Sequence, residues 1–101
     1  MASSKEYLYY VLEQLSALDE ITYRAMMGEY IIYYRGIIMG GIYDDRFLVK
    51  QTHAAKTMMP DSTLEIPYAG AKEMILVDNI DNREFLNQLF KAIFRELSDC
   101  K

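Results

Sequence analysis

The 101-residue chain has few of the residues that build metal sites and disulfides. It contains one cysteine, Cys100, and one histidine, His53. A lone cysteine excludes an internal disulfide, and scarce cysteine is typical of a reducing compartment. His53 has no second histidine or nearby cysteine with which to bind zinc, and it has no recognisable partner for base catalysis. We therefore expect no metal, no cofactor and no enzymatic activity.

Long apolar segments and an excess of basic charge are also missing. The uncharged run from Gly36 to Tyr43 is far shorter than the ~20 residues that span a bilayer. Lys5 and Glu6 interrupt the start of the chain, where a signal peptide would need an apolar stretch. The net charge is -4, whereas free-standing nucleic-acid binding favours a basic face. We expect a cytoplasmic protein with no membrane partner, for which direct nucleic-acid binding is disfavoured.

Two ligand-binding patterns are absent as well. The three central glycines lie inside an expected hairpin and no Gly-Lys-Ser/Thr follows them, so they do not form a phosphate loop. The acidic clusters at 44–45 and 78–81 lack the glycine and terminal glutamate of an EF-hand. Turn and helix-cap chemistry explains both clusters.

The composition, 51% hydrophobic and 26% charged, is that of a single folded domain over residues 1–101. The stretch from 24 to 50 is rich in Ile, Tyr, Phe and Val, which favour strands. Turn residues at 35–36 and 44–45 divide it into an antiparallel meander. We predict strands at 21–26, 29–34 and 37–43, a further one at 47–52, an edge strand at 64–68 and a strand at 73–77.

Three helices are predicted around this sheet. The first, at about 4–15, follows a capping box from Ser3 to Glu6. A short middle helix at 53–59 is capped by Thr52 and ends at Pro60. The last follows a cap at Asp81 and carries an apolar stripe: Phe85, Leu86, Leu89, Phe90, Ile93, Phe94 and Leu97. The fold class is therefore α+β, a two-layer sandwich in the order α-βββ-α-ββ-α, with about five antiparallel strands.

Five motifs occur in order along the chain: Arg24-x-Met-Met-Gly-Glu-Tyr30, Tyr34-x-Gly36, Asp44-Asp45-x-Phe-Leu-Val-Lys50, Pro67-Tyr-x-Gly-Ala-Lys72 and Asp81-Asn-Arg-Glu-Phe85. Together they resemble the N-terminal domain of the TfoX/Sxy family, over roughly residues 4–97. The resemblance implies the α+β fold that also occurs in secretion chaperones. It further implies a role in natural competence, because the family's regulators act with the cyclic AMP receptor protein at a subset of its promoters. Those regulators carry a second, helical domain, so we expect this chain to be a stand-alone N-terminal domain.

The candidate partner-binding residues come from these motifs and from the tyrosines. The chain has nine tyrosines, and strand alternation cannot bury all of them. Exposed tyrosines are favoured at protein interfaces. The predicted strand at 29–34 is apolar on both faces, so one face should meet the helices and the other a partner, such as a second copy. The candidates are Arg24, Gly28, Tyr33, Tyr34, Lys50 and Lys72. The simpler interpretation is that they are turns and solvated charges, whose ion pairs contribute about 0–1 kcal/mol each.

Three functions remain open at this stage. The first is a non-enzymatic protein-interaction module in transcriptional regulation, acting through a protein partner such as a cyclic AMP receptor-type transcription factor, or as a homodimer. The second is direct nucleic-acid binding by cations with stacking tyrosines; these cations are Arg24, Arg35, Arg46, Lys50 and Lys72. The third is a small-molecule binder or enzyme with a cleft between Gly28 and Lys72, which would need convergent polar groups.

Overall fold

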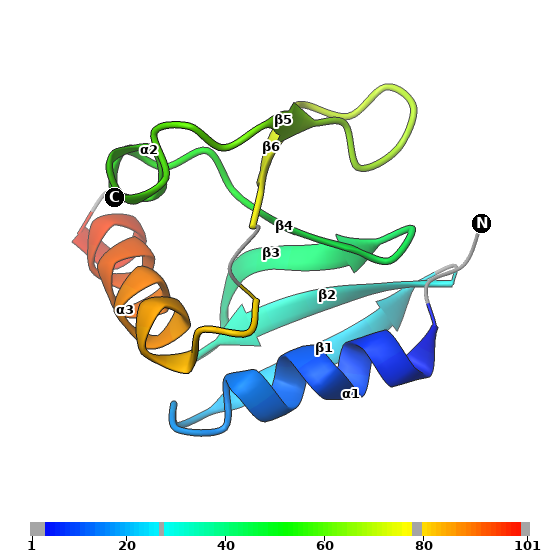
Figure 1. Ribbon diagram of the computed structural model, residues 1–101, viewed down its shortest axis with the longest axis horizontal. Helices are drawn as coiled ribbons and strands as arrows, with labels where there is room; N and C mark the ends of the chain where they lie inside the picture. Colours follow the sequence, from blue (N-terminus) through cyan, green and yellow to red (C-terminus); the bar gives the residue numbers. More distant parts are fainter. Residues whose placement is uncertain (1–3, 27, 78–79, 100–101) are drawn as a thin grey trace.

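The computed structural model describes residues 4–26, 28–77 and 80–99. Its elements are α1 (Lys5–Gln14), β1 (Ile21–Met26), β2 (Glu29–Tyr34), β3 (Ile37–Tyr43), β4 (Arg46–Val49), α2 (His53–Met58), β5 (Leu64–Glu65), β6 (Met74–Leu76) and α3 (Arg83–Asp99). The strands form one six-stranded antiparallel sheet in the order β1-β2-β3-β4-β6-β5 (Figure 1). The predicted α+β fold is confirmed. The sheet has six strands rather than about five, because a strand forms at each of the six predicted ranges and all six join one sheet.

Two tight turns build the meander from β2 to β4. Arg35 and Gly36 have φ angles of 53° and 81°, and Asp44 and Asp45 have φ angles of 54° and 55°. Two consecutive positive φ values are the hallmark of the hairpin turns whose twist matches that of the strands. The Asp44 N–H also donates to Glu29 Oε2 at 2.8 Å, which ties the second turn to the start of β2.

An irregularity in β3 brings a side chain into the core. Ile32 opposes Gly40 and Tyr33 opposes Ile38, so Met39 has no opposite residue on β2. Met39 is fully buried. A side chain at Gly40 would collide with the Leu48 carbonyl oxygen, so the close approach of β3 and β4 here depends on glycine.

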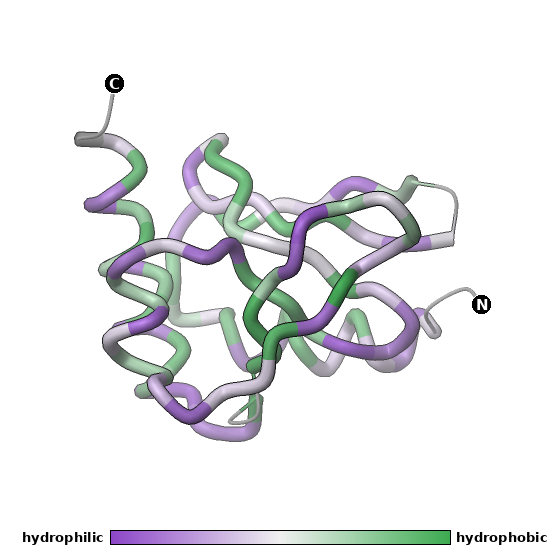
Figure 2. Tube along the Cα trace, turned by 90° about the horizontal axis from the view of Figure 1, so that it is seen from above, coloured by the Kyte–Doolittle hydropathy of each residue, from purple (hydrophilic) through white to green (hydrophobic). Residues whose placement is uncertain are grey.

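The core lies between one face of the sheet and the helices α1 and α3. On β2, Tyr30, Ile32 and Tyr34 are buried, whereas Ile31 and Tyr33 are half-buried on the other face. This alternation was predicted and is confirmed. The buried members of the predicted α3 stripe are Leu86, Leu89, Phe90 and Ile93. Figure 2 shows hydrophobic and hydrophilic segments alternating along α3, as expected of a helix with one face on a core.

Helix caps agree with the predictions at α2 and lie one residue later at α1 and α3. The Thr52 hydroxyl accepts from the Ala55 N–H at 3.1 Å, as predicted. Ser4, not Ser3, caps α1, and Asn82, not Asp81, caps α3, where its Oδ1 accepts from Phe85 N–H. Ser3 lies outside the described residues. In both places two cap-forming residues are adjacent, and only the backbone conformation decides which one reaches an N–H three residues on.

Three strands are shorter than predicted, and one of them is β6, which covers Met74–Leu76 rather than residues 73–77. β4 ends at Val49 rather than at residue 52, because Thr52 serves as the cap of α2. β5 contains only Leu64 and Glu65, and it forms the edge of the sheet as predicted. The chain leaves the sheet at residue 66 and returns at β6. The connecting segment, residues 66–73, lies beside the sheet and helps to form the site described next.

Candidate functional site

The sheet face that points away from α1 and α3 is open over much of its area. We call it the outer face. The register places Arg24 opposite Ile31, and Tyr33 opposite Ile38, on this face. Ile38 is 37% exposed, and Ile31 and Tyr33 are half-buried. Apolar side chains on an open face are typical of binding surfaces when they are contiguous.

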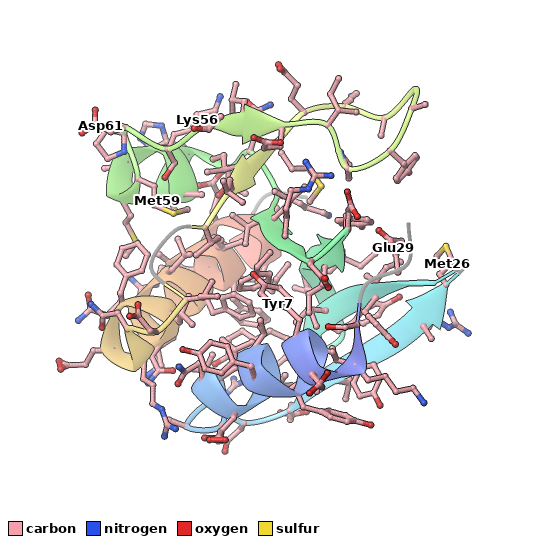
Figure 3. The ribbon with its side chains drawn as sticks, turned by 45° about the vertical axis from the view of Figure 1, so that its right-hand side comes forward. Tyr7, Met26, Glu29, Lys56, Met59 and Asp61 are labelled. Carbon is pink, nitrogen blue, oxygen red and sulfur yellow. The ribbon has the colours of Figure 1, made fainter. Side chains whose placement is uncertain are left out.

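A groove runs along the outer face next to segment 66–73. One part has a volume of about 470 Å³ and is lined by Met26, Glu29, Ile31, Tyr43 and Tyr68. The adjoining part, about 490 Å³, shares Ile31, Tyr43 and Tyr68 and continues past Lys50 and Lys72. We call the two parts together the outer groove. Figure 3 shows Met26 and Glu29 at the end of the β1–β2 hairpin, on the same side of the molecule as segment 66–73.

Tyr43 and Tyr68 form the aromatic centre of the outer groove. Their ring centroids are 6.1 Å apart at an angle of 51°. A Cβ atom on Gly41 would lie 2.8 Å from the Tyr43 ring and 2.6 Å from the Tyr30 carbonyl oxygen, so glycine makes room for the ring. Burial raises the pKa of the Tyr43 hydroxyl, and the neighbouring Tyr68 and Glu29 add to the rise. Tyr43 therefore stays protonated at neutral pH and can donate a hydrogen bond.

Polar side chains hold segment 66–73 at both of its ends. Arg46 Nη1 donates to Glu65 Oε1 at 2.6 Å, and Arg46 Nη2 donates to the Ile66 carbonyl at 3.4 Å. Gln51 Nε2 donates to the Glu73 carbonyl at 2.8 Å. These bonds fasten the segment to β4 and the residues just after it, and thereby keep Tyr68 beside the groove.

The structure brings several of the predicted candidates to this surface. Lys50 and Lys72, far apart in sequence, both line the outer groove. Arg24 lies on the outer face opposite Ile31, and Tyr33 lies there beside Ile38. Gly28, with a φ of 85°, lies in the turn that leads to Glu29. Arg24, Tyr33, Lys50 and Lys72 therefore lie on or beside one face of the sheet, and their binding of a partner stays a prediction.

Tyr34 lies elsewhere. Its side chain is only 4% exposed, and its ring is 5.3 Å from Phe94 and 6.3 Å from Phe90, centroid to centroid. Because successive strand residues point to opposite faces, Tyr33 and Tyr34 cannot share a surface. Tyr34 therefore belongs to the core and offers no contact to a partner.

Most of the apolar lining of the groove was not among the site residues predicted from the sequence. The missed residues are Met26, Ile31, Ile38, Tyr43 and Tyr68. Strand alternation already placed Ile31 and Tyr33 on one face, and this was the available signal. The position of Tyr68 could not be predicted from strand alternation, because it depends on how segment 66–73 folds back.

The five cations considered for nucleic-acid binding do not form one patch. Arg35 Nε lies 3.8 Å from Glu20 Oε2. The Arg35 guanidinium also lies over the rings of Tyr34 and Phe94. Arg46 is half-buried in its ion pair with Glu65. The other three, Arg24, Lys50 and Lys72, are exposed on or near the outer face.

Two further features are absent from the described residues. No three His, Cys, Asp or Glu side chains in these ranges come together as a metal site would require. Among the described helices, none is both long and apolar enough to cross a membrane.

The described elements define a small α+β domain with an aromatic groove on the open face of its sheet. Residues 13–86 match the family model of the TfoX N-terminal domain, and the chain belongs to this family. It is also similar to the "Uncharacterized 12.7 kDa protein in trpE 5'region" of Spirochaeta aurantia, with 29% identity over 80 residues, 79% of this chain and 70% of that protein. No solved structure matches the chain. The family match spans every residue that lines the outer groove.

Proposed function

We propose that this TfoX N-terminal domain is a non-enzymatic protein-interaction module that acts in transcriptional regulation. The outer groove is its docking site. The observation that carries the proposal is the contiguous set of Ile31, Tyr43 and Tyr68 between the β1–β2 hairpin and segment 66–73. Tyrosines that offer a large apolar area with a polar tip are typical anchors of protein interfaces.

The charges along the groove define the chemistry of its occupant. Lys50 and Lys72 lie at one part of the groove, and Glu29 lies at the other. An extended protein segment with apolar side chains for the aromatic centre and a carboxylate for the lysines fits this arrangement. Membership in the family makes a cyclic AMP receptor-type transcription factor the first partner to test.

The test is a binding titration of the fluorescently labelled domain with the purified cyclic AMP receptor-type transcription factor of the same organism, followed by anisotropy. Tyr68→Ala and Lys72→Glu should each weaken binding about tenfold, equivalent to about 1.4 kcal/mol. Tyr10→Ala and Lys91→Glu are the matched controls, because both residues are exposed on helices and outside the groove lining. Absence of binding by the unmodified domain, or equal losses in the controls, would contradict the proposal.

A DNA titration separates this function from direct nucleic-acid binding. A mixed-sequence duplex at low salt gives phosphate contacts their best chance, and the salt dependence counts them. We expect no binding by the domain alone, since only three of the five candidate cations are available on the outer face. Binding that weakens steeply with salt would favour a nucleic-acid function instead.

A small molecule is the second candidate occupant. The part of the groove around Tyr43 has a volume of about 470 Å³, within the range of small-molecule pockets. Glu29 is the one charged residue among its described lining residues, so it supplies few convergent polar groups. A thermal-shift screen with apolar amines and aromatic compounds would favour this candidate if a hit depended on Glu29 and Tyr43.

A further inference from the structure

We propose that two copies of this chain pair through β1, which joins their sheets edge to edge into one continuous sheet. This edge differs from the outer groove, to whose described lining β1 contributes Met26 alone. β1 is at one end of the strand order, so β2 is its one strand neighbour in the described sheet. Every residue of β1 after Ile21 is exposed.

The backbone groups that point outward from β1 follow from its pairing with β2. The Arg35 N–H donates to the Glu20 carbonyl at 3.0 Å, so the residue before β1 is in a hydrogen-bonded pair. Hydrogen-bonded and non-hydrogen-bonded pairs alternate along an antiparallel ladder. The even-numbered residues of β1 therefore bond to β2. The odd-numbered residues direct their N–H and C=O groups away from the sheet: Ile21, Tyr23 and Ala25.

β1 carries little of the protection that free edges of sheets have. Such edges are usually shortened, bulged, or furnished with proline or lysine. β1 is six residues long and pairs with β2 without a register shift. It contains no proline or lysine, and Arg24 is its one charged residue. It is therefore a ready template for a further strand.

The spacing of the outward groups is self-complementary. A two-fold axis at Tyr23 places Tyr23 opposite Tyr23 of the second copy, and Ile21 opposite Ala25. All the outward N–H and C=O groups of these residues are then paired in both copies, as a two-fold interface requires. Because the same three residues supply the donors and acceptors of both strands, a second copy of β1 is the partner that this edge fits.

The charges at this edge agree with the same register. In this register Arg24 comes opposite Thr22 of the second copy, so the two Arg24 side chains are not directly opposed. The register therefore avoids the direct opposition of like charges, which destabilises strand pairs.

Exposed tyrosines enlarge the contact beyond the strands. One strand pair is small against the ~1,200–2,000 Å² of a stable interface. Tyr23 is 43% exposed and Tyr9 is 55% exposed. Tyr9 lies on the side of α1 opposite to Tyr7, whose hydroxyl contacts the backbone of Phe47 in β4. Tyr9 therefore faces the β1 side of the molecule, where α1 runs alongside β1 (Figure 1).

Sedimentation equilibrium over a range of protein concentrations tests the dimer. The unmodified chain should shift from monomer to dimer mass as concentration rises. Ala25→Pro removes one outward N–H without removing a bond to β2, so it should remain monomeric with an unchanged circular dichroism spectrum. Ala25→Val keeps the N–H and should dimerise like the unmodified chain.

Oxidative crosslinking tests the register and does not depend on the proline variant folding. Cysteines are introduced singly into a Cys100→Ser background. Tyr23→Cys should crosslink, because directly opposed residues of a hydrogen-bonded pair have Cα atoms about 5.5 Å apart, within disulfide range. Thr22→Cys should not, because the two copies of residue 22 are offset by two residues along the strand, roughly 6.8 Å in addition to the strand spacing. A mass that stays monomeric for the unmodified chain, dimerisation of Ala25→Pro, or equal crosslinking of both cysteines would overturn the proposal.

Discussion

Tyr33 and Tyr34 are neighbours of the same type on one strand, yet they belong to different regions of the molecule. Tyr34 lies beneath α3 between Phe90 and Phe94 and is 4% exposed. Tyr33 is half-buried on the outer face opposite Ile38. The difference comes from the layer that covers each face, not from the residue. The number of tyrosines therefore does not indicate where each one lies. The face of the sheet to which a tyrosine points decides whether it stabilises the core or is available for binding.

The two faces of the sheet are also covered through different interactions. The helix-covered face is closed by large apolar side chains that are almost fully buried. The outer face is closed at one end by segment 66–73, which polar side chains such as Arg46 and Gln51 attach to the sheet. Regions with few buried apolar contacts open at lower free energy than the core. We therefore expect segment 66–73 to open at a lower free energy than the helix-covered core.

The largest effect should separate the two faces directly. Tyr34→Ala should lower the free energy of unfolding by about 3 kcal/mol or more, because it empties a site packed against two phenylalanine rings. Tyr33→Ala should lower it by less than about 1 kcal/mol, since a half-exposed side chain loses little buried area. Urea unfolding of both variants is the measurement. Similar losses in the two variants would show that the outer face is also part of the core.

A smaller effect is expected at Gly41, which makes room for the Tyr43 ring on the outer face. Gly41→Ala should lower the free energy of unfolding by about 1–3 kcal/mol, because the new methyl group meets the Tyr43 ring and the Tyr30 carbonyl. It should also weaken partner binding by displacing the Tyr43 ring. Repeating the substitution in a Tyr43→Ala background should cost less, a coupling that a double-mutant cycle measures. If Gly41→Ala lowered the free energy of unfolding equally in the two backgrounds, the new methyl group would clash with the Tyr30 carbonyl and not with the Tyr43 ring.

Arg46 tests whether polar bonds govern the closure of the outer face. Arg46→Met removes its bonds to Glu65 and to the Ile66 and Tyr43 carbonyls, and loss of the half-exposed ion pair should cost about 1 kcal/mol or less. Hydrogen exchange should accelerate in segment 66–73 while the amides of β2 stay protected. Arg95→Met, on the exposed side of α3, is the control and should leave hydrogen exchange unchanged in both segment 66–73 and β2. Uniform acceleration through the sheet would contradict a separate, weakly held segment.

The smallest effect concerns the contact between α2 and α3. Glu96 accepts hydrogen bonds from the His53 and Ala54 N–H groups at 2.9 and 2.7 Å, and these bonds lower its pKa below the ordinary value of 4.5. The ionised form therefore stabilises the fold above that value, and this contribution disappears as the pH falls through the lowered pKa. Glu96→Gln should be slightly less stable than the unmodified chain at about pH 6, and the difference should shrink in acid. Urea unfolding at several pH values measures it, and a difference independent of pH would contradict the role of the charge.

Local patterns anticipated most of the elements. The alternation on β2 and the stripe on α3 each report a single element's own burial, so they were readable without knowing the neighbours. The ends of elements were less certain at Ser4 and Asn82, where adjacent residues are equally able to cap. The site was only partly anticipated: Lys50 and Lys72 came from motifs, whereas Tyr43 and Tyr68 meet only after segment 66–73 folds back over the sheet.

By itself, the sequence determined the α+β class, the order of the helices and strands, the faces of β2 and membership in the TfoX N-terminal family. The class, the element order and the strand faces depend on periodicity and turn chemistry, which act over a few residues, whereas the family membership rests on the ordered motifs and the family match. Only the tertiary structure decided that Tyr34 is core, that Lys50 and Lys72 share a groove, and that β1 is left as a regular, exposed edge. Those outcomes depend on contacts between residues far apart along the chain, and the pattern of any single element carries no information about which other element will cover it.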